Sequence, residues 1–190
     1  MSARILKGKP VADSMQAALS EKAHELRKKG IIPKLCIIRV GERSDDIAYE
    51  TGAVKKMTAT GIEADRVILN ASCTQEELEE VMKEKNSDEE VHGILMLRPL
   101  PAHLDEKKIT LMISPEKDVD CMNPATLAGI FEPSEGFKTP CTPQAVIEML
   151  RYYAIELTGK KVAVLGRSSV IGKPVALLLL NENAAVTIRH

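Results

Sequence analysis

Apolar residues recur along this chain with a helical period in some stretches and run continuously in others. Residues 10–30 open with Pro10, which is favoured at the first position of a helix, and close with Gly30, a common helix stop. The apolar positions between them are three or four residues apart, which predicts a helix with one buried stripe. The stripe consists of Val11, Met15, Leu19, Ala23 and Leu26.

Short apolar runs and helical patterns then alternate up to about residue 100. The predicted strands are 35–40, 66–69 and one that begins at Gly93 and runs into a proline-bounded loop ending at Pro101. The predicted helices are 45–60 and one that follows residue 74. Thr74 and Glu77 form a capping box at the start of that last helix. Alternating strands and helices predict a mostly parallel sheet covered on both faces. Ligands bind beyond the carboxyl ends of the strands in such sheets, so the segments after Val40 and Leu97 are candidate site loops.

The last third of the chain repeats this alternation after a proline-rich connector at 131–143. A helix capped by Thr142-Pro143 is expected to reach about Tyr153, followed by a strand at 161–166, a helix at 172–180 and a strand at 184–189. A doubly wound nucleotide domain has about six strands. The fold class is therefore α/β, with an N-terminal α/β domain at 1–140 and the first part of a Rossmann-type nucleotide domain at 141–190. The second domain is expected to be incomplete in this chain.

Composition and charge exclude several classes of partner. The formal net charge is -1, from 26 basic and 27 acidic residues, which gives no electrostatic reason to expect nucleic acid or a membrane surface. Cys36, Cys73, Cys121 and Cys141 are widely spaced without a C-x-x-C pair, so neither a metal site nor a disulfide framework is predicted. No apolar run approaches the roughly 20 residues of a membrane span. We expect a cytoplasmic protein.

The stretch VLGRSSVIGKP, residues 164–174, carries the strongest chemical signal. A predicted strand ends at Gly166, a helix begins near Gly172, and small residues fill the loop between them. Glycines let the backbone approach a ligand closely, and the N–H groups of a helix N-terminus favour phosphate. The spacing is G-x-x-x-x-x-G rather than G-x-G-x-x-G, so a glycine-rich turn without a ligand is an open alternative.

Five motifs in order resemble the methylenetetrahydrofolate dehydrogenase/cyclohydrolase family, the FolD proteins. They are LRPLP (97–101), PEKDVDC (115–121), TPCTP (139–143), LTGKKVAVLG (157–166) and GRSSVIGKP (166–174). The resemblance implies a folate-binding catalytic domain at 1–140 and NAD(P) binding at 141–190. It also implies a tetrahydrofolate derivative as substrate and a homodimer. The family is longer than this chain by roughly a third.

The resemblance also assigns roles to residues. Tyr49 and Asp120 correspond to the family's substrate-contacting and catalytic tyrosine and aspartate, and Pro99 and Leu100 lie in its substrate loop. The cofactor contacts correspond to Gly166, Arg167, Ser168, Ile171, Gly172 and His190. Arg167 suits the 2′-phosphate of NADP, which makes NADP the expected cofactor and NAD the alternative. Without the resemblance, Tyr49 is read as a packing residue and Asp120 as part of a solvated loop.

Two family residues that handle protons are replaced here. The lysine four residues after the tyrosine is Ala53, and the glutamine of the Q-L-P-L-P motif is Leu97. The family serine three residues before Tyr49 is Asp46. Hydride loss from the methylene bridge requires positioning but no base, whereas opening the resulting cation with water requires proton transfer. We therefore predict a dehydrogenase with weak or lost cyclohydrolase activity.

Two alternatives follow from the same positions. Lys56 lies about 20° from Tyr49 around the helix and about 10 Å along it, so it could replace the missing lysine, although a solvated surface lysine is the simpler interpretation. Loss of several active-site residues is also compatible with a degenerate folate- or nucleotide-binding protein.

Overall fold

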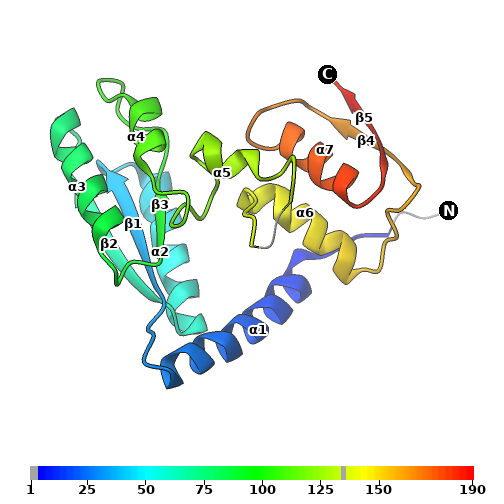
Figure 1. Ribbon diagram of the computed structural model, residues 1–190, viewed down its shortest axis with the longest axis horizontal. Coiled ribbons are helices and arrows are strands. Elements are labelled where there is room, and N and C mark those ends of the chain that lie inside the picture. Colours follow the sequence, from blue (N-terminus) through cyan, green and yellow to red (C-terminus); the bar gives the residue numbers. More distant parts are fainter. Residues whose placement is uncertain (1–3, 134–135) are drawn as a thin grey trace. The chain divides into compact units, whose positions relative to one another are not determined.

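The computed structural model describes residues 4–133 and 136–190, which form two compact units (Figure 1). One unit is Gln16–Asn123, and the other combines the chain up to Met15 with Pro124–His190. Helix α1 (Gly8–Lys28) contributes to both. These units are defined by compactness, so the functional division at residues 140 and 141 stays a prediction.

A three-stranded parallel sheet organises the unit Gln16–Asn123, in the order β2-β1-β3. Its strands are β1 (Lys34–Val40), β2 (Glu63–Leu69) and β3 (Gly93–Met96), and its further helices are α2 (Ser44–Thr60), α3 (Gln75–Ser87) and α4 (Glu106–Met112). Lys34 pairs with Glu63 and Leu35 with Gly93, so β1 is the central strand. The predicted parallel sheet is confirmed.

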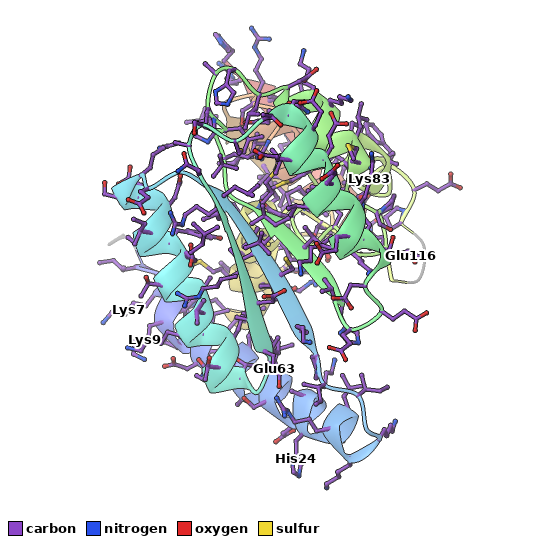
Figure 2. All side chains as sticks on the ribbon, turned by 90° about the vertical axis from the view of Figure 1, so that its left-hand side faces the viewer. Lys7, Lys9, His24, Glu63, Lys83 and Glu116 are labelled. Atoms are coloured by element: carbon purple, nitrogen blue, oxygen red, sulfur yellow. The ribbon has the colours of Figure 1, made fainter. Side chains whose placement is uncertain are left out.

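Helices cover both faces of this sheet. Successive side chains of β1 point to opposite faces, so each face packs against a different set of helices. Cys36, Ile38 and Val40 pack in one cluster with Leu78 and Met82 of α3 and with residues of α4. Ile37 points to the other face and packs with Leu95, Leu97 and residues of α2. Polar side chains such as His24 on α1 and Lys83 on α3 point outward (Figure 2).

The ends of these helices follow local sequence signals. The capping box before α3 is confirmed, since Thr74 accepts a hydrogen bond from the Glu77 N–H and Glu77 accepts one from the Thr74 N–H. Gly61 ends α2 with a φ of 84°, a left-handed conformation that favours glycine. The predicted stripe of α1 is only partly correct. Val11 and Ala23 are buried, whereas the side chains of Met15, Leu19 and Leu26 are exposed.

The other unit contains α5 (Pro124–Ala128), α6 (Cys141–Tyr152), β4 (Lys161–Leu165), α7 (Gly172–Asn181) and β5 (Ala185–Arg189). Strands β4 and β5 pair in parallel, from Lys161 with Ala185 to Leu165 with Arg189. Helix α7 joins them and packs its apolar residues on α6 and on both strands. This is a strand-helix-strand part of a Rossmann-type domain, as predicted. Leu165 and Ile188 remain exposed, so the described residues leave part of this sheet uncovered.

The structure differs from the sequence analysis in a helix cap and in two additional helices, and one predicted segment is only partly described. Thr142 does not cap α6, because Pro140 occupies the N-cap position and its carbonyl already accepts the N–H of Gln144. Helices α4 and α5 were not predicted. The connector predicted at 131–143 includes residues 134–135, which lie outside the described residues.

Candidate active site and nucleotide loop

A hollow of about 340 Å³ lies at the carboxyl ends of β1 and β3. Residues from the start of α2, from the end of β3 and from the loop after α4 surround it. They are Arg43, Asp45, Asp46, Tyr49, Leu95, Met96, Leu97, Arg98, Asp120 and Met122. The two loops that the sequence singled out, after Val40 and after Leu97, therefore meet at one site.

The first turns of α2 place a carboxylate and a phenol on the same side of the helix. Asp46 and Tyr49 are three residues apart, which makes them neighbours on the helix surface, and both line the hollow. Asp46 is buried, whereas Tyr49 is 59% exposed. Ala53, one turn beyond Tyr49, packs against the cluster of Ile37, Leu95 and Leu97. No lysine lines the hollow among the residues that the structure describes.

Asp118 shapes the loop that carries Asp120. Its carboxylate is fully buried and accepts hydrogen bonds from the backbone N–H groups of Asp120, Met122 and Asn123, at donor–acceptor distances of 3.3, 3.1 and 2.8 Å. Asn123 donates in turn to the carbonyl of Ile113 at 2.9 Å. A buried carboxylate that accepts several backbone bonds holds a loop in one shape. Asp118 is therefore a positioning residue for Asp120.

Cys121 adopts a φ of 52°, in the left-handed region that side chains other than glycine rarely occupy. The family motif has glycine at this position, and the conformation explains why. The bonds that Asp118 makes on either side of Cys121 hold the backbone in this strained form. The departure from the motif thus leaves a side chain in a backbone conformation that favours glycine.

The loop after β3 is held from two directions. Glu106 accepts the Leu100 N–H at 3.0 Å, and its other carboxylate oxygen lies 3.7 Å from a guanidinium nitrogen of Arg98. Arg43 donates to the Pro99 carbonyl at 3.2 Å. Leu100 is buried in the core, and neither Pro99 nor Leu100 is among the described residues that line the hollow. Leu97 and Arg98 line it instead.

Lys56 lies elsewhere on the same unit. Its ammonium group donates to the side-chain oxygen of Gln16 on α1 at 3.1 Å. It is not among the described residues of the hollow that contains Tyr49 and Asp120. The structure therefore brings Tyr49 and Asp120 together but not Lys56.

The ionised side chains around the hollow have an acidic balance. Three carboxylates and two guanidiniums line it, which gives a formal charge of −3 + 2 = −1. Arg98 is also paired with Glu106, outside the lining, and this pairing offsets part of its positive charge. A hollow of this kind favours a cationic group over an anionic one.

A second hollow, of about 730 Å³, lies in the other unit at the carboxyl ends of β4 and β5. It contains all six residues predicted to bind the cofactor. Its lining consists of Val146, Val164, Leu165, Gly166, Arg167, Ser168, Ile171, Gly172, Val175 and His190. The loop between β4 and α7 therefore forms one wall, and His190, directly after β5, forms another.

Ser168 organises the start of α7. Its hydroxyl oxygen accepts the backbone N–H groups of Ile171 and Gly172 at 3.1 and 3.2 Å, and its carbonyl accepts that of Lys173 at 3.0 Å. The N–H groups that the sequence analysis expected to favour phosphate are therefore already paired within the loop. Because the Ser168 oxygen acts as acceptor in both bonds, its hydroxyl hydrogen can be donated to a ligand. Phosphate recognition would then use this hydroxyl rather than the first N–H groups of the helix.

The two glycines of the loop are required for different reasons. Gly166 has a φ of 112°, which disfavours other residues. A β-carbon on Gly172 would lie 2.4 Å from the Gly166 carbonyl oxygen, closer than packed atoms allow. The loop therefore folds back on itself at these two points. A tight turn of this kind fits a dinucleotide, whose pyrophosphate must approach the backbone closely.

Arg167 supplies positive charge to the second hollow. Its side chain is exposed, and no ion pair to it occurs within residues 4–133 and 136–190. A guanidinium in this position suits a phosphate group by charge and geometry.

Sequence reasoning missed three polar residues of the first hollow and its support: Arg43, Arg98 and Asp118. Arg43 and Arg98 lie in the two candidate site loops, after Val40 and after Leu97, which is the signal that could have found them. No sequence signal marked Asp118, because its role is to accept backbone N–H groups of the folded loop. In the described part of the chain, no helix is long and apolar enough to cross a membrane.

Models of two domains match the chain. The catalytic domain of tetrahydrofolate dehydrogenase/cyclohydrolase matches residues 6–120, and the NAD(P)-binding domain of the same enzyme matches residues 140–190. The chain belongs to the tetrahydrofolate dehydrogenase/cyclohydrolase family. The suspected resemblance to FolD proteins is thereby confirmed.

Relatives agree along the whole chain. It is 51% identical over 187 residues to the bifunctional protein FolD of Clostridioides difficile, covering 98% of this chain and 65% of that protein. The crystal structure of FolD from Campylobacter jejuni superposes with a TM-score of 0.95 at 34% identity, covering 100% of this chain and 67% of that one. FolD from Trypanosoma brucei, crystallised with NADP and an inhibitor, superposes with a TM-score of 0.91 at 39% identity, covering 100% of this chain and 65% of that one. The chain thus spans about two thirds of the length of these family members.

Proposed function

We propose that the protein is an NAD(P)-dependent 5,10-methylenetetrahydrofolate dehydrogenase whose methenyltetrahydrofolate cyclohydrolase activity is weak or lost. The observation that carries this proposal is the composition of the first hollow. It combines Tyr49 and Asp120 with an acidic balance, and no lysine lines it among the described residues.

Tyr49 and Asp120 suit recognition of the pterin ring. The exposed phenol of Tyr49 offers a flat apolar surface for stacking, and the Asp120 carboxylate can accept N–H bonds from the pterin. Bound NAD(P) supplies the acceptor for the hydride that leaves the methylene bridge. The task of this chain is to orient the folate for that transfer, which requires no proton carrier.

Hydrolysis of the methenyl product makes a different demand. Water must be deprotonated as it adds, and a lysine with a lowered pKa suits that task. At the corresponding position Ala53 is packed on an apolar cluster. Loss of such a group typically slows a step by on the order of 100- to 10,000-fold.

A second candidate function is a bifunctional enzyme. Relatives at 44–51% identity carry the name bifunctional protein FolD, which favours retention of both activities. The bond from Lys56 to Gln16 weighs against Lys56 as the substitute base. Arg98 and Arg43 line the hollow and could orient water, but a guanidinium does not lose its proton near neutral pH.

NADP is the proposed cofactor, with NAD as the alternative. The residues of the second hollow fit a dinucleotide, because the glycine turn allows close approach and Ser168 and Arg167 offer donors. Arg167 in addition suits a 2′-phosphate. We further propose that the protein is cytoplasmic and acts as a homodimer, as the family resemblance implies.

One experiment separates the candidates. The full-length protein is mixed with methylenetetrahydrofolate and either NADP or NAD, and reduced cofactor and methenyl product are followed separately. Cofactor reduction with accumulation of the methenyl product is the expected result. Rapid loss of that product to the formyl form would establish the bifunctional enzyme. Absence of cofactor reduction with both nucleotides would instead indicate a degenerate binding protein.

A further inference from the structure

Asp46 is unusual among the acidic residues of the first hollow. Its side chain is only 10% exposed, while the neighbouring Asp45 is exposed. The nearest cation is Arg43, whose Nε lies 3.8 Å from an Asp46 oxygen, which is too long for a hydrogen bond. Within residues 4–133 and 136–190 the Asp46 carboxylate has no other ion pair. It is therefore a largely buried negative charge that lines the hollow with incomplete neutralisation.

The fold keeps this carboxylate in place. Asp46 lies in the first turn of α2, where the helix dipole stabilises a negative charge. Arg43 is itself held by its bond to the Pro99 carbonyl. Because Asp46 and Tyr49 are one turn apart, a ring stacked on the phenol would come close to the carboxylate.

We propose that Asp46 stabilises the positive charge formed on the folate during oxidation and thereby makes this site selective for the cationic product. The proposal rests on the proposed dehydrogenase function. When the methylene bridge loses a hydride, one hydrogen and two electrons pass to the nicotinamide, which is reduced. The folate is oxidised, and a positive charge is left delocalised over the bridge carbon and its two nitrogens.

A fixed negative charge beside this bridge favours oxidation of the folate and disfavours hydrolysis of the product. It is attracted more strongly to the developing cation than to the uncharged substrate, so it lowers the barrier to oxidation. The same attraction makes the cation less ready to accept water. Asp46 and Ala53 therefore complement each other, since one adds negative charge where the family has serine and the other removes the amine that would repel the cation.

Affinity measured without cofactor tests this charge selectivity directly. Methenyltetrahydrofolate has a cationic ring system and tetrahydrofolate an uncharged one, whereas both carry the same glutamate tail. Rapid mixing gives the affinity of the full-length protein for each before hydrolysis proceeds. Asp46→Asn keeps shape and removes the charge, and Asp46→Ser restores the family residue. Glu42→Gln is the control, because Glu42 is an exposed carboxylate in the loop before α2 and is not among the described residues that line the hollow.

In the Asp46 variants we expect affinity for the cation to fall by on the order of tenfold, with little change for tetrahydrofolate. Glu42→Gln should change both affinities much less, because solvent screens an exposed charge. A selectivity ratio that is unchanged in Asp46→Asn, in protein that still reduces NAD(P), would overturn the role of Asp46 alone. An equal loss of affinity for the cation in Glu42→Gln would also overturn it. If the wild-type protein reduces neither NADP nor NAD, the proposed function fails and this inference fails with it.

Discussion

The carboxylate of Glu50 on α2 accepts a hydrogen bond from Nε of Arg39 on β1 at 2.5 Å, and both side chains are almost completely buried. Arg39 also donates to the carbonyl of Gly41, just beyond the end of β1. Arg66 on β2 lies 3.5 Å from the second oxygen of Glu50. This network joins α2 to the carboxyl end of the sheet, so the helix that carries Asp46 and Tyr49 is anchored within one turn of both.

Removing the Glu50 charge should destabilise the fold strongly. Glu50→Gln leaves the buried Arg39 guanidinium without its counter-charge, and breaking such a pair costs about 3–5 kcal/mol. Denaturant unfolding at neutral pH would measure the loss. Asp13→Asn is the control, because its pair with Lys9 is exposed and worth at most about 1 kcal/mol. Equal effects of the two substitutions would contradict the importance of the buried pair.

Introducing a lysine at position 53 should create hydrolytic activity. Ala53→Lys places an amine one turn from Tyr49, and we expect methenyltetrahydrofolate to be hydrolysed about 100- to 10,000-fold faster by the variant. Decay of the methenyl product, corrected for the reaction without protein, gives the rate. Ala53→Met matches the length of lysine without its charge and controls for disturbed packing. If the lysine variant is no faster than the methionine variant, a missing amine does not limit hydrolysis.

The pair of Glu79 on α3 and Lys108 on α4 should make stability depend on pH at both extremes. Its atoms are 2.5 Å apart, and the hydrogen bond from Lys108 lowers the pKa of Glu79 below its usual 4.5. The stabilisation is therefore present above about that pH and is lost as pH falls through the folded-state pKa. The hydrogen bond from Glu79 likewise raises the pKa of Lys108 above its usual 10.5, so stabilisation is present below 10.5 and is lost as pH rises further.

Glu79→Gln tests this linkage. The variant should melt at a lower temperature than the wild type near neutral pH, and the difference should shrink toward both acidic and strongly alkaline pH. Thermal unfolding across the pH range measures both limbs. A constant difference at every pH would show that Glu79 acts through packing alone.

The four cysteines should differ sharply in reactivity. Burial raises the pKa of Cys36 to about 12, with a further contribution from Asp65, and burial also raises the pKa of Cys73. Cys121 is buried, and Cys141 is exposed. Iodoacetamide at about pH 8 should therefore label Cys141 first in the native protein, because the thiolate is the reactive form and must be accessible. Mass spectrometry of peptides locates the label, and rapid native labelling of Cys36 would contradict the buried core around β1.

Local signals predicted most of the fold. Apolar runs located β1, β4 and β5 closely. In β1 the run reflects burial on both faces of the sheet, whereas β4 and β5 are only partly covered by the described residues. Helix α4 escaped prediction because it is short and its signal is one aspartate cap, Asp105, after a proline-rich loop. The predicted buried stripe of α1 was too long, because helical periodicity shows which positions share a face but not which of them the rest of the chain covers.

The candidate site was predictable only where chemistry and backbone position coincide. Tyr49 and Asp120 were expected together, and they line one hollow. Lys56 was proposed from its angle around α2, but the angle does not determine which neighbour its long side chain reaches, and it bonds to Gln16 on α1. Asp118 was missed because its role is to satisfy backbone N–H groups, a task that becomes visible only when the loop is folded.

The bonds that Ser168 makes with the start of α7 affect how a dinucleotide would be received. A loop whose amide groups are already satisfied can keep its shape with and without a ligand, so an arriving phosphate meets an ordered receptor rather than a segment that must first be ordered. Affinity in such a receptor is not reduced by the entropy of ordering the loop, and release of the spent nucleotide does not require the loop to unfold.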